Sequence, residues 1–364
     1  MFRKLLYLAV FCWLMFPKNV LAQQSGRVYE FLSLPLSARI TSLGGFAIPS
    51  LDADVESALF YPSLLNPEVN NFLSLNFVDY FSDINYGTVA FAQTFGELGT
   101  FSASVQYINY GRFTETDITG QEIGHFSAGE YSFMAGWGRP LSEHWSIGTN
   151  LKLIYSSLHD FNSLGIAVDV SFTYVNPDRL FAAGLVARNA GRQIVHFNQN
   201  RSEPLPFDLV FGASKKLPKA PLRFSLAIHN LHRFDLTYTS PLTLPDPNLQ
   251  DQVNQQTAGN RLSEIADKVL RHIVIGAEFL PTSNFAVRFG YNYRRRQELK
   301  VDSRVSTVGF SWGFGIRISR FHFSYGRSTY HLAGAPNHIT VSTRLSDFFN
   351  WGTPVPSQPQ AHDH

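Results

Sequence analysis

Side chains that could carry out chemistry are few and widely spaced in this sequence. His362-Asp363-His364 stand at the end of the chain, and His229 and His232 lie three residues apart around the end of an expected strand. A flexible tail offers a metal ion no preformed geometry, and polar roles in a strand or loop account better for the other pair. No Gly-rich phosphate loop, zinc-ligand spacing or nucleophile elbow occurs in the fold context that it needs. We therefore expect no catalytic residues, no cofactor and no metal site.

One basic cluster, Arg294-Arg295-Arg296, stands at the outer end of an expected strand. Guanidinium groups suit phosphate and carboxylate ligands. A solvated loop is the simpler interpretation of this cluster. The functional interpretation is a surface contact with phosphorylated lipopolysaccharide or with an acidic protein partner.

The first residues predict export. Arg3 and Lys4 precede an uncharged apolar run from Leu5 to Phe16, and Val20-Leu21-Ala22 follows it. This order is typical of a secretory signal peptide, here 1–22 with cleavage after Ala22. An uncleaved anchor is disfavoured because the run is about half the length of a spanning helix, which needs roughly 20 residues.

Removing this segment changes the charge and the redox chemistry of the chain. Three of the 30 Lys and Arg residues precede the cleavage site, whereas all 28 Asp and Glu residues follow it. The mature chain is then close to neutral, which gives no reason to expect nucleic acid as a partner. Cys12, the one cysteine, follows Phe11 rather than a small residue, so lipidation is disfavoured. Its loss leaves no thiol for a disulfide or a metal.

The remaining composition favours a β-barrel in a membrane. Aromatic residues make up 14% of the chain and charged residues 16%, yet the mean hydropathy is −0.08. Such a composition suits strands with one face toward lipid and one toward water. The best candidate for a spanning helix after the signal, 305–316, lies between Arg304 and Arg317 and is too short.

From Phe72 onward, apolar residues alternate with polar or small ones. In 164–174, for example, Leu, Ile, Val, Val, Phe and Tyr alternate with Gly, Ala, Asp, Ser and Thr. Successive side chains of a strand point to opposite faces, so each segment has one apolar and one polar wall. The pattern predicts about fourteen strands, near 72–80, 84–95, 99–110, 128–140, 144–156, 161–175, 179–190, 205–217, 221–232, 271–281, 284–294, 304–317, 319–328 and 337–347.

The expected connections alternate in length, as in outer-membrane barrels with short periplasmic turns and longer outer loops. The longer ones are 111–127, 191–204, 233–270, 295–303 and 329–336. We therefore predict an all-β membrane protein, an antiparallel outer-membrane β-barrel at 72–350. A secreted β-sandwich or propeller is the alternative, but it needs shorter strands or a repeat that the sequence lacks.

The segments on either side of the barrel differ in kind from it. We expect 23–71 to lie in the lumen as a plug, with a short helix within 55–65, although a disordered periplasmic lead is the simpler alternative. We expect a flexible periplasmic tail at 351–364. In the longest outer loop, 263–270 predicts a short helix with Ser263 as its N-cap.

Several motifs resemble the PorQ-like members of the PorV/FadL-like β-barrel family. They cover most of the mature chain, and they are Tyr29-Glu30-Phe31-Leu32-Ser33-Leu34-Pro35, Ser37-Ala38-Arg39, Leu43-Gly44-Gly45, Asn66-Pro67, Asp83-Ile84-Asn85-Tyr86-Gly87, Gln106-Tyr107-Ile108-Asn109-Tyr110-Gly111, Asn162-Ser163-Leu164-Gly165, Pro204-Leu205-Pro206-Phe207-Asp208, His229-Asn230-Leu231 and Asp235-Leu236-Thr237.

The resemblance implies an outer-membrane component of the type IX secretion system of Bacteroidota, with a FadL-like fourteen-stranded barrel. It implies a non-enzymatic anchor for a PorZ-like surface protein, in a complex with PorU-like and PorV-like proteins that joins cargo to lipopolysaccharide. The family has no catalytic residues. We expect Arg39, Gly44, Gly45, Asn66 and Pro67 to shape the plug.

Other functions stay open at this point. A FadL-like transporter of hydrophobic small molecules is the main alternative, although a fold by itself does not establish an activity. A general porin would need an open polar lumen. A membrane phospholipase or protease would need a Ser/His or acidic pair at one rim, which the sequence does not offer.

Overall fold

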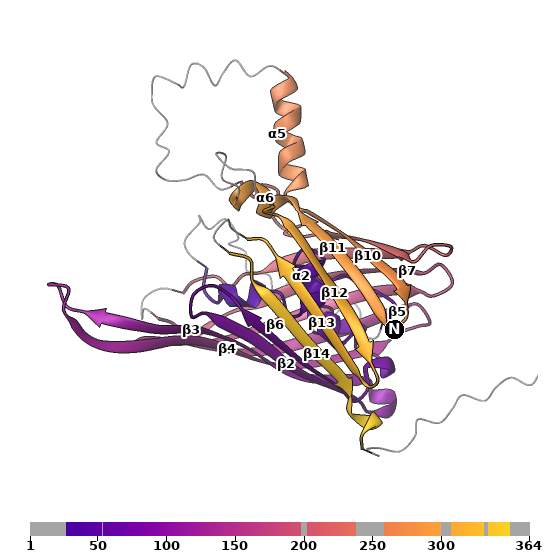
Figure 1. The fold of residues 1–364 in the computed structure, drawn as a ribbon, viewed down its shortest axis with the longest axis horizontal. Coiled ribbons are helices and arrows are strands. Elements are labelled where there is room, and N and C mark those ends of the chain that lie inside the picture. Colours follow the sequence, from indigo (N-terminus) through magenta and orange to yellow (C-terminus); the bar gives the residue numbers. More distant parts are fainter. Residues whose placement is uncertain are drawn as a thin grey trace, which may run out of the picture.

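The alternating segments of the sequence form strands that pair edge to edge. The computed structural model describes residues 27–52, 54–197, 202–237, 258–299, 307–330 and 334–349. Within these residues, fourteen strands close into one antiparallel barrel, in which β1 pairs with β14 (Figure 1). This confirms the predicted fold and strand number. The strands are β1 (Phe72–Asp79), β2 (Asn85–Thr94), β3 (Thr100–Thr116), β4 (Glu122–Pro140), β5 (Trp145–Leu158), β6 (Phe161–Asn176), β7 (Phe181–Val195), β8 (Asp208–Lys216), β9 (Leu222–Ile228), β10 (Ile273–Thr282), β11 (Phe285–Asn292), β12 (Phe310–Ile318), β13 (Phe321–Ser328) and β14 (Asn337–Arg344).

The two faces of the wall carry different side chains, as the alternation predicts. In β5, Leu151 and Leu153 are each 50% exposed on the outside, whereas Asn150 and Lys152 are 1% and 2% exposed. Large aliphatic and aromatic residues of most strands are exposed in the same way. An apolar outer surface of this extent suits a lipid environment rather than water.

Connections alternate in length from β7 onward, as predicted, whereas those before β7 are short at both ends of the barrel. The short-turn rim carries connections of two to five residues, at 95–99, 141–144, 177–180, 217–221, 283–284 and 319–320. The opposite end, the long-loop rim, carries longer connections at 196–207, 229–272, 293–309 and 329–336. Two helices, α5 (Ala258–Leu270) and α6 (Tyr293–Leu299), lie at this long-loop rim (Figure 1).

One predicted loop is mostly strand. We expected 111–127 to be an outer loop, but β3 continues to Thr116 and β4 begins at Glu122, so the hairpin projects beyond the barrel (Figure 1). The alternation is interrupted by a register shift between Asn109 and Arg112. At this bulge Gly111 adopts a φ of +85°, which a glycine tolerates without strain. The extra residue in β3 exchanges the inward and outward positions that follow it. The alternation of apolar and polar residues therefore appeared to stop at the bulge, and the predicted strand ended too early.

Three further boundaries differ from the prediction. Strand β7 continues to Val195, although we expected an outer loop from 191. The helix predicted at 263–270 begins at Ala258, so Ser263 lies inside α5 and is not its N-cap. The strand predicted at 304–317 begins at Phe310, and the described part of the chain before it starts at residue 307. In the first two cases the strand or helix extends past the residue that looked like its boundary.

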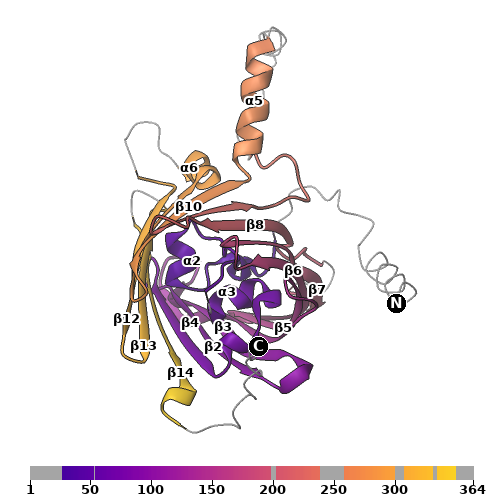
Figure 2. The same ribbon diagram turned by 90° about the vertical axis from the view of Figure 1, so that its right-hand side faces the viewer.

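The N-terminal segment, residues 27–71, lies within the ring of strands (Figure 2). It contains η1 (Glu30–Ser33), α2 (Ala38–Ser42), α3 (Val55–Phe60), η2 (Pro62–Leu64) and η3 (Pro67–Val69), in agreement with the short helix expected within 55–65. The side chain of Ser37 accepts a hydrogen bond from the Ile40 amide, and that of Asp54 accepts bonds from Glu56 and Ser57. These are the capping interactions that let such short helices form.

The interior of the barrel is filled by this segment. Its apolar side chains form buried clusters with inward-facing residues of the wall, one of which includes Ile40, Leu59, Tyr61 and Leu65. Glycines of the wall allow close approach, because a Cβ on Gly148 would lie 2.2 Å from the Pro62 carbonyl carbon. The core of the molecule therefore lies inside the barrel rather than between sheets.

Some expectations fall outside the described residues. These are the signal peptide at 1–22, the tail at 351–364 and the middle of the longest loop, 238–257. Among the helices of the described residues, none has the length and apolar character needed to cross a membrane.

Candidate functional site in the barrel lumen

Arg39 of α2 lies at the centre of a group of charges of which all but Asp52 are buried. Its Nη1 atom is 3.0 Å from Asp54 Oδ2, and its Nη2 atom is 3.0 Å from Asp52 Oδ2. The same Nη2 atom reaches the barrel wall, 3.2 Å from Glu278 Oε2 in β10. Arg39 therefore joins two parts of the N-terminal segment to the barrel.

The wall supplies the other members of this group. Glu278 accepts hydrogen bonds from Arg223 Nη1 in β9 and from Arg288 Nε in β11, both at 2.9 Å. Arg223 also donates to Asp52 Oδ1 at 2.8 Å. We call these six residues the luminal ionic cluster: Arg39, Arg223, Arg288, Asp52, Asp54 and Glu278.

The charges of the luminal ionic cluster balance, with three guanidinium groups and three carboxylates. Glu278 and Asp54 have side chains only 2% and 7% exposed. Buried charges are tolerated when each has a partner, and removal of one partner leaves another charge unpaired. The cluster is thus a specific link between the segment and three adjacent strands.

Two carboxyl groups of the segment have opposite protonation preferences. Burial opposes the ionisation of Asp54, but its hydrogen bonding with Glu56 and the charge of Arg39 outweigh burial and hold the pKa of Asp54 below its usual range. Burial, followed by the negative charge of Asp54, raises the pKa of Glu56 well above its usual range. The surroundings therefore favour the ionised form of Asp54 and the protonated form of Glu56. Glu56 also accepts a hydrogen bond from Ser74 of β1.

Gly44 and Gly45 end α2 in a conformation that requires glycine. Their φ angles are +102° and +97°, and their amides donate to Thr41 O at 3.1 Å and Ile40 O at 2.9 Å. A Cβ on Gly44 would lie 2.3 Å from Val274 Cγ1 on β10. The pair therefore turns the chain where it meets the barrel wall.

Asn66 and Pro67 begin the last short helix of the segment. Asn66 Oδ1 accepts a hydrogen bond from the Glu68 amide at 2.9 Å, and Pro67 occupies the first turn of η3. Proline suits this position because its missing N–H would have no helical partner there. The two residues set the direction in which the chain leaves the lumen for β1.

The basic cluster 294–296 lies in α6 and divides into different environments. Arg294 pairs with Glu298 at 2.7 Å. Arg295 turns toward the segment, with its guanidinium 3.5 Å from Gly44 O and 4.2 Å from the centre of the Tyr330 ring. Arg296 packs beside Gly309. The structure thus brings the glycine pair and Arg295 together, a contact that their separation in the sequence gave no reason to expect.

His229 and His232 have polar and packing roles, as expected. His229 is buried, stacks on Phe46 at 4.5 Å and shares a hydrogen bond with Asn230. His232 packs against the Phe207 ring. In the part of the chain that the structure describes, no group of three or more His, Cys, Asp or Glu side chains could hold a metal ion. His362 and His364 lie outside that part.

A second polar group in the lumen was not singled out from the sequence. Lys152 Nζ lies 2.7 Å from Asp169 Oδ2 and 2.7 Å from Asn189 Oδ1. Beside it, the Arg188 guanidinium lies 3.8 Å from the centre of the Phe60 ring of α3. The available signal was a pair of opposite charges at inward positions of β5 and β6, which alternation assigns to the same face.

Comparison with known proteins identifies the fold. No family model matches the chain, and no curated protein matches it. Among solved structures, the Ralstonia pickettii toluene transporter TbuX shares 12% identity and a TM-score of 0.51, over 86% of this chain and 99% of the transporter. A Pseudomonas aeruginosa FadL homologue has 8% identity and a TM-score of 0.46, over 85% of this chain and 98% of the homologue.

The chain has the fold of FadL-like outer-membrane barrels. This likeness supports a location in the outer membrane, in agreement with the apolar outer wall. At these identities the likeness concerns the fold.

Proposed function

We propose that this protein is a non-enzymatic outer-membrane barrel, closed by its N-terminal segment, that holds a surface protein at its long-loop rim. The observation that carries the proposal is α5, which projects from this rim away from the barrel (Figures 1 and 2). Two ion pairs, between Lys268 and Asp235 and between Lys268 and Glu264, are both 3.0 Å long and fix its C-terminal turns.

The free face of α5 suits a protein partner. Ile265 and Val269 are one helical turn apart and are 51% and 44% exposed. Exposed apolar side chains on one face of a helix, beyond the lipid-facing wall, are typical of helix-in-groove recognition. The projecting β3–β4 hairpin adds Ile118 and Ile123 to the exposed apolar residues of the same rim.

The finer proposal is that the partner is a PorZ-like protein of the type IX secretion system attachment complex, together with PorU-like and PorV-like proteins. Its support is the resemblance in the motifs of the N-terminal segment. Arg39 of those motifs lies in the luminal ionic cluster, and Gly44 and Gly45 contact the wall beside it. A segment fixed in this way closes the lumen, so the long-loop rim is the surface that we expect to bind the partner.

The test is an affinity pulldown of the tagged mature protein from detergent-solubilised outer membrane, read by mass spectrometry. We expect a surface protein with the wild type, and at least a tenfold lower yield with Ile265→Ser/Val269→Ser. Leu98→Ser, which changes an exposed apolar residue of the short-turn rim, is the matched control and should leave the yield unchanged. Equal recovery from all three barrels would reject α5 as the docking element, and recovery of the barrel without a partner would reject the function.

Transport of hydrophobic small molecules is the second candidate. The fold likeness to the toluene transporter TbuX favours it. A transporter of this kind needs an apolar path past the segment, whereas the described inner wall carries polar and charged residues at most of its buried positions. The test is uptake of toluene into proteoliposomes that contain the protein. A rate above that of protein-free liposomes would favour transport over the anchoring function.

A further inference from the structure

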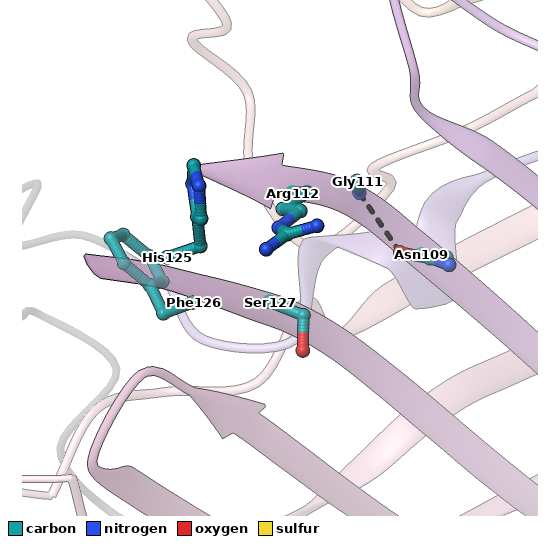
Figure 3. Close-up of a pocket in the computed structure, with 6 residues that line it drawn as sticks. All are labelled: Asn109, Gly111, Arg112, His125, Phe126 and Ser127. Carbon is teal, nitrogen blue, oxygen red and sulfur yellow. Dashed lines mark hydrogen bonds between the residues drawn. The ribbon is translucent and has the colours of Figure 1, made fainter. Parts of the chain in front are cut away.

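A pocket lies on the β3–β4 hairpin just beyond the bulge at Gly111. It is open and has a volume of about 430 Å³, and its lining residues are Asn109, Gly111, Arg112, His125, Phe126 and Ser127 (Figure 3). The bulge creates the space: Asn109 Oδ1 accepts a hydrogen bond from the Gly111 amide at 2.9 Å and holds the turn of the strand. The pocket is therefore built into the hairpin backbone.

The pocket is on the outer face of the barrel wall. Below the bulge, Tyr131 of β4 points outward and is 42% exposed. Side chains of β4 alternate, so His125 and Ser127 lie on the same outer face as Tyr131. Arg112 pairs with Ser127 across the hairpin, which places its side chain on this face as well.

A row of tyrosines on neighbouring strands indicates where the pocket lies along the membrane normal. Tyr107 pairs with Tyr131, and Tyr131 pairs with Tyr155, so three adjacent strands carry a tyrosine at paired positions. Such rows mark the boundary between hydrocarbon and headgroups in outer-membrane barrels. Ser127 is four residues beyond Tyr131, roughly 13 Å along the strand and less along the membrane normal because barrel strands are tilted. The pocket thus lies in the headgroup layer.

The two basic side chains of the pocket have no acidic partner among the described residues. Arg112 and His125 are both exposed, and neither forms a salt bridge with any other residue that the structure describes. Figure 3 shows Arg112 extending from β3 beside His125 of β4. A guanidinium with an imidazole and a hydroxyl at its side is a donor set suited to phosphate oxygens.

We propose that this pocket binds the phosphate of an outer-leaflet lipid headgroup, with Arg112 as the main ligand and His125 and Ser127 as further donors. Phe126 also lines the pocket, and its ring stacks on that of Phe113. The occupant is a lipid rather than a free anion because the pocket opens directly above the tyrosine row, where phosphorylated headgroups are concentrated. This inference is independent of the surface partner proposed above.

The experiment measures lipid binding to the purified mature protein by native mass spectrometry, with diphosphorylated lipid A as the probe. We expect a wild-type complex and an affinity at least tenfold lower for Arg112→Gln/His125→Gln. Arg112→Lys, which keeps the charge but not the planar donor pair, should lie between them. Arg139→Gln removes an exposed arginine of the same strand β4 at the short-turn rim, and it should bind like the wild type.

Three outcomes would overturn the proposal. The first is equal affinity of the double variant and the wild type, with both folded as judged by heat-modifiable migration. The second is an equal loss in Arg139→Gln, which would mean that net charge rather than the pocket attracts the lipid. The third is displacement of lipid A by inorganic phosphate at an equal concentration, which would identify the pocket as a site for the free anion.

Discussion

At the scale of single residues, the balance of the luminal ionic cluster matters more than any one bond in it. Arg39 contacts all three carboxylates of the cluster, whereas Arg288 contacts only Glu278. Loss of Arg39 leaves Asp54, whose side chain is 7% exposed, without its cation. Loss of an exposed arginine leaves water to solvate its partner.

Arg39→Met is therefore expected to lower the free energy of unfolding by about 3 kcal/mol, in the range measured for breaking a buried pair. The measurement is guanidinium unfolding of the protein in lipid vesicles. Arg294→Met, which removes the cation of an i, i+4 pair in α6, is the control and should cost under about 1 kcal/mol. Equal losses in the two variants would contradict the role given to Arg39.

Glu56 gives the protein a pH dependence of definite sign. Its folded-state pKa is raised, chiefly by burial and then by Asp54. Its contribution to stability is therefore complete below the unfolded pKa and is lost as pH rises toward the folded value. We expect the wild-type Tm to fall between pH 5 and pH 9 and the Glu56→Gln variant to fall less. Parallel curves for the two proteins would show that Glu56 is ionised when folded.

At the scale of elements, the turn after α2 depends on the absence of a side chain. Gly44→Ala forces a positive φ on alanine and brings its Cβ against Val274. We expect a loss of about 2 kcal/mol or more, from strain and overpacking together. Gly120→Ala, at φ +86° with no heavy atom within 4 Å, isolates the strain. The same unfolding assay should show a smaller loss there.

Much of the element structure could be predicted from the sequence, and the exceptions have physical reasons. Strand number and wall faces follow from the period of two, because each inward position must fit the lumen and each outward position the lipid. The continuation of β3 and β4 was missed because one extra residue at Gly111 reverses the pattern. A single sequence records the alternation but not the register of the partner strand.

The candidate site was predictable in part. Arg39, Gly44 and Gly45 were singled out from motifs, but their partners were not. Glu278 is 239 residues from Arg39, and only closure of the barrel brings the two together. Arg295 was expected at the surface as one of three equal arginines, whereas the short helix α6 gives each of them a different direction. Contacts of this kind depend on tertiary structure that local patterns do not contain.

At the scale of the whole molecule, the proposed plug predicts that the wild-type barrel does not conduct ions. If the segment closes the lumen through the luminal ionic cluster, Arg39→Glu places a fourth carboxylate there and repels the segment from β10. We expect stepwise ion conductance in planar bilayers that the wild type lacks. Arg327→Glu, an exposed change on β13, should conduct no more than the wild type. If the Arg39→Glu barrel showed no ion conductance, other contacts would suffice to hold the plug.

The packing of α2 also bears on the order of assembly. This helix contacts β11, β12, β13 and β14, the last strands of the chain to be synthesised, and β14 must pair with β1 to close the barrel. The segment that begins the described chain therefore has no complete binding surface until the final strands are present. The packing of α2 and the pairing of β1 with β14 therefore depend on the same strands. A chain that lacks its last strands loses both. Its N-terminal segment then remains exposed to proteases in the periplasm.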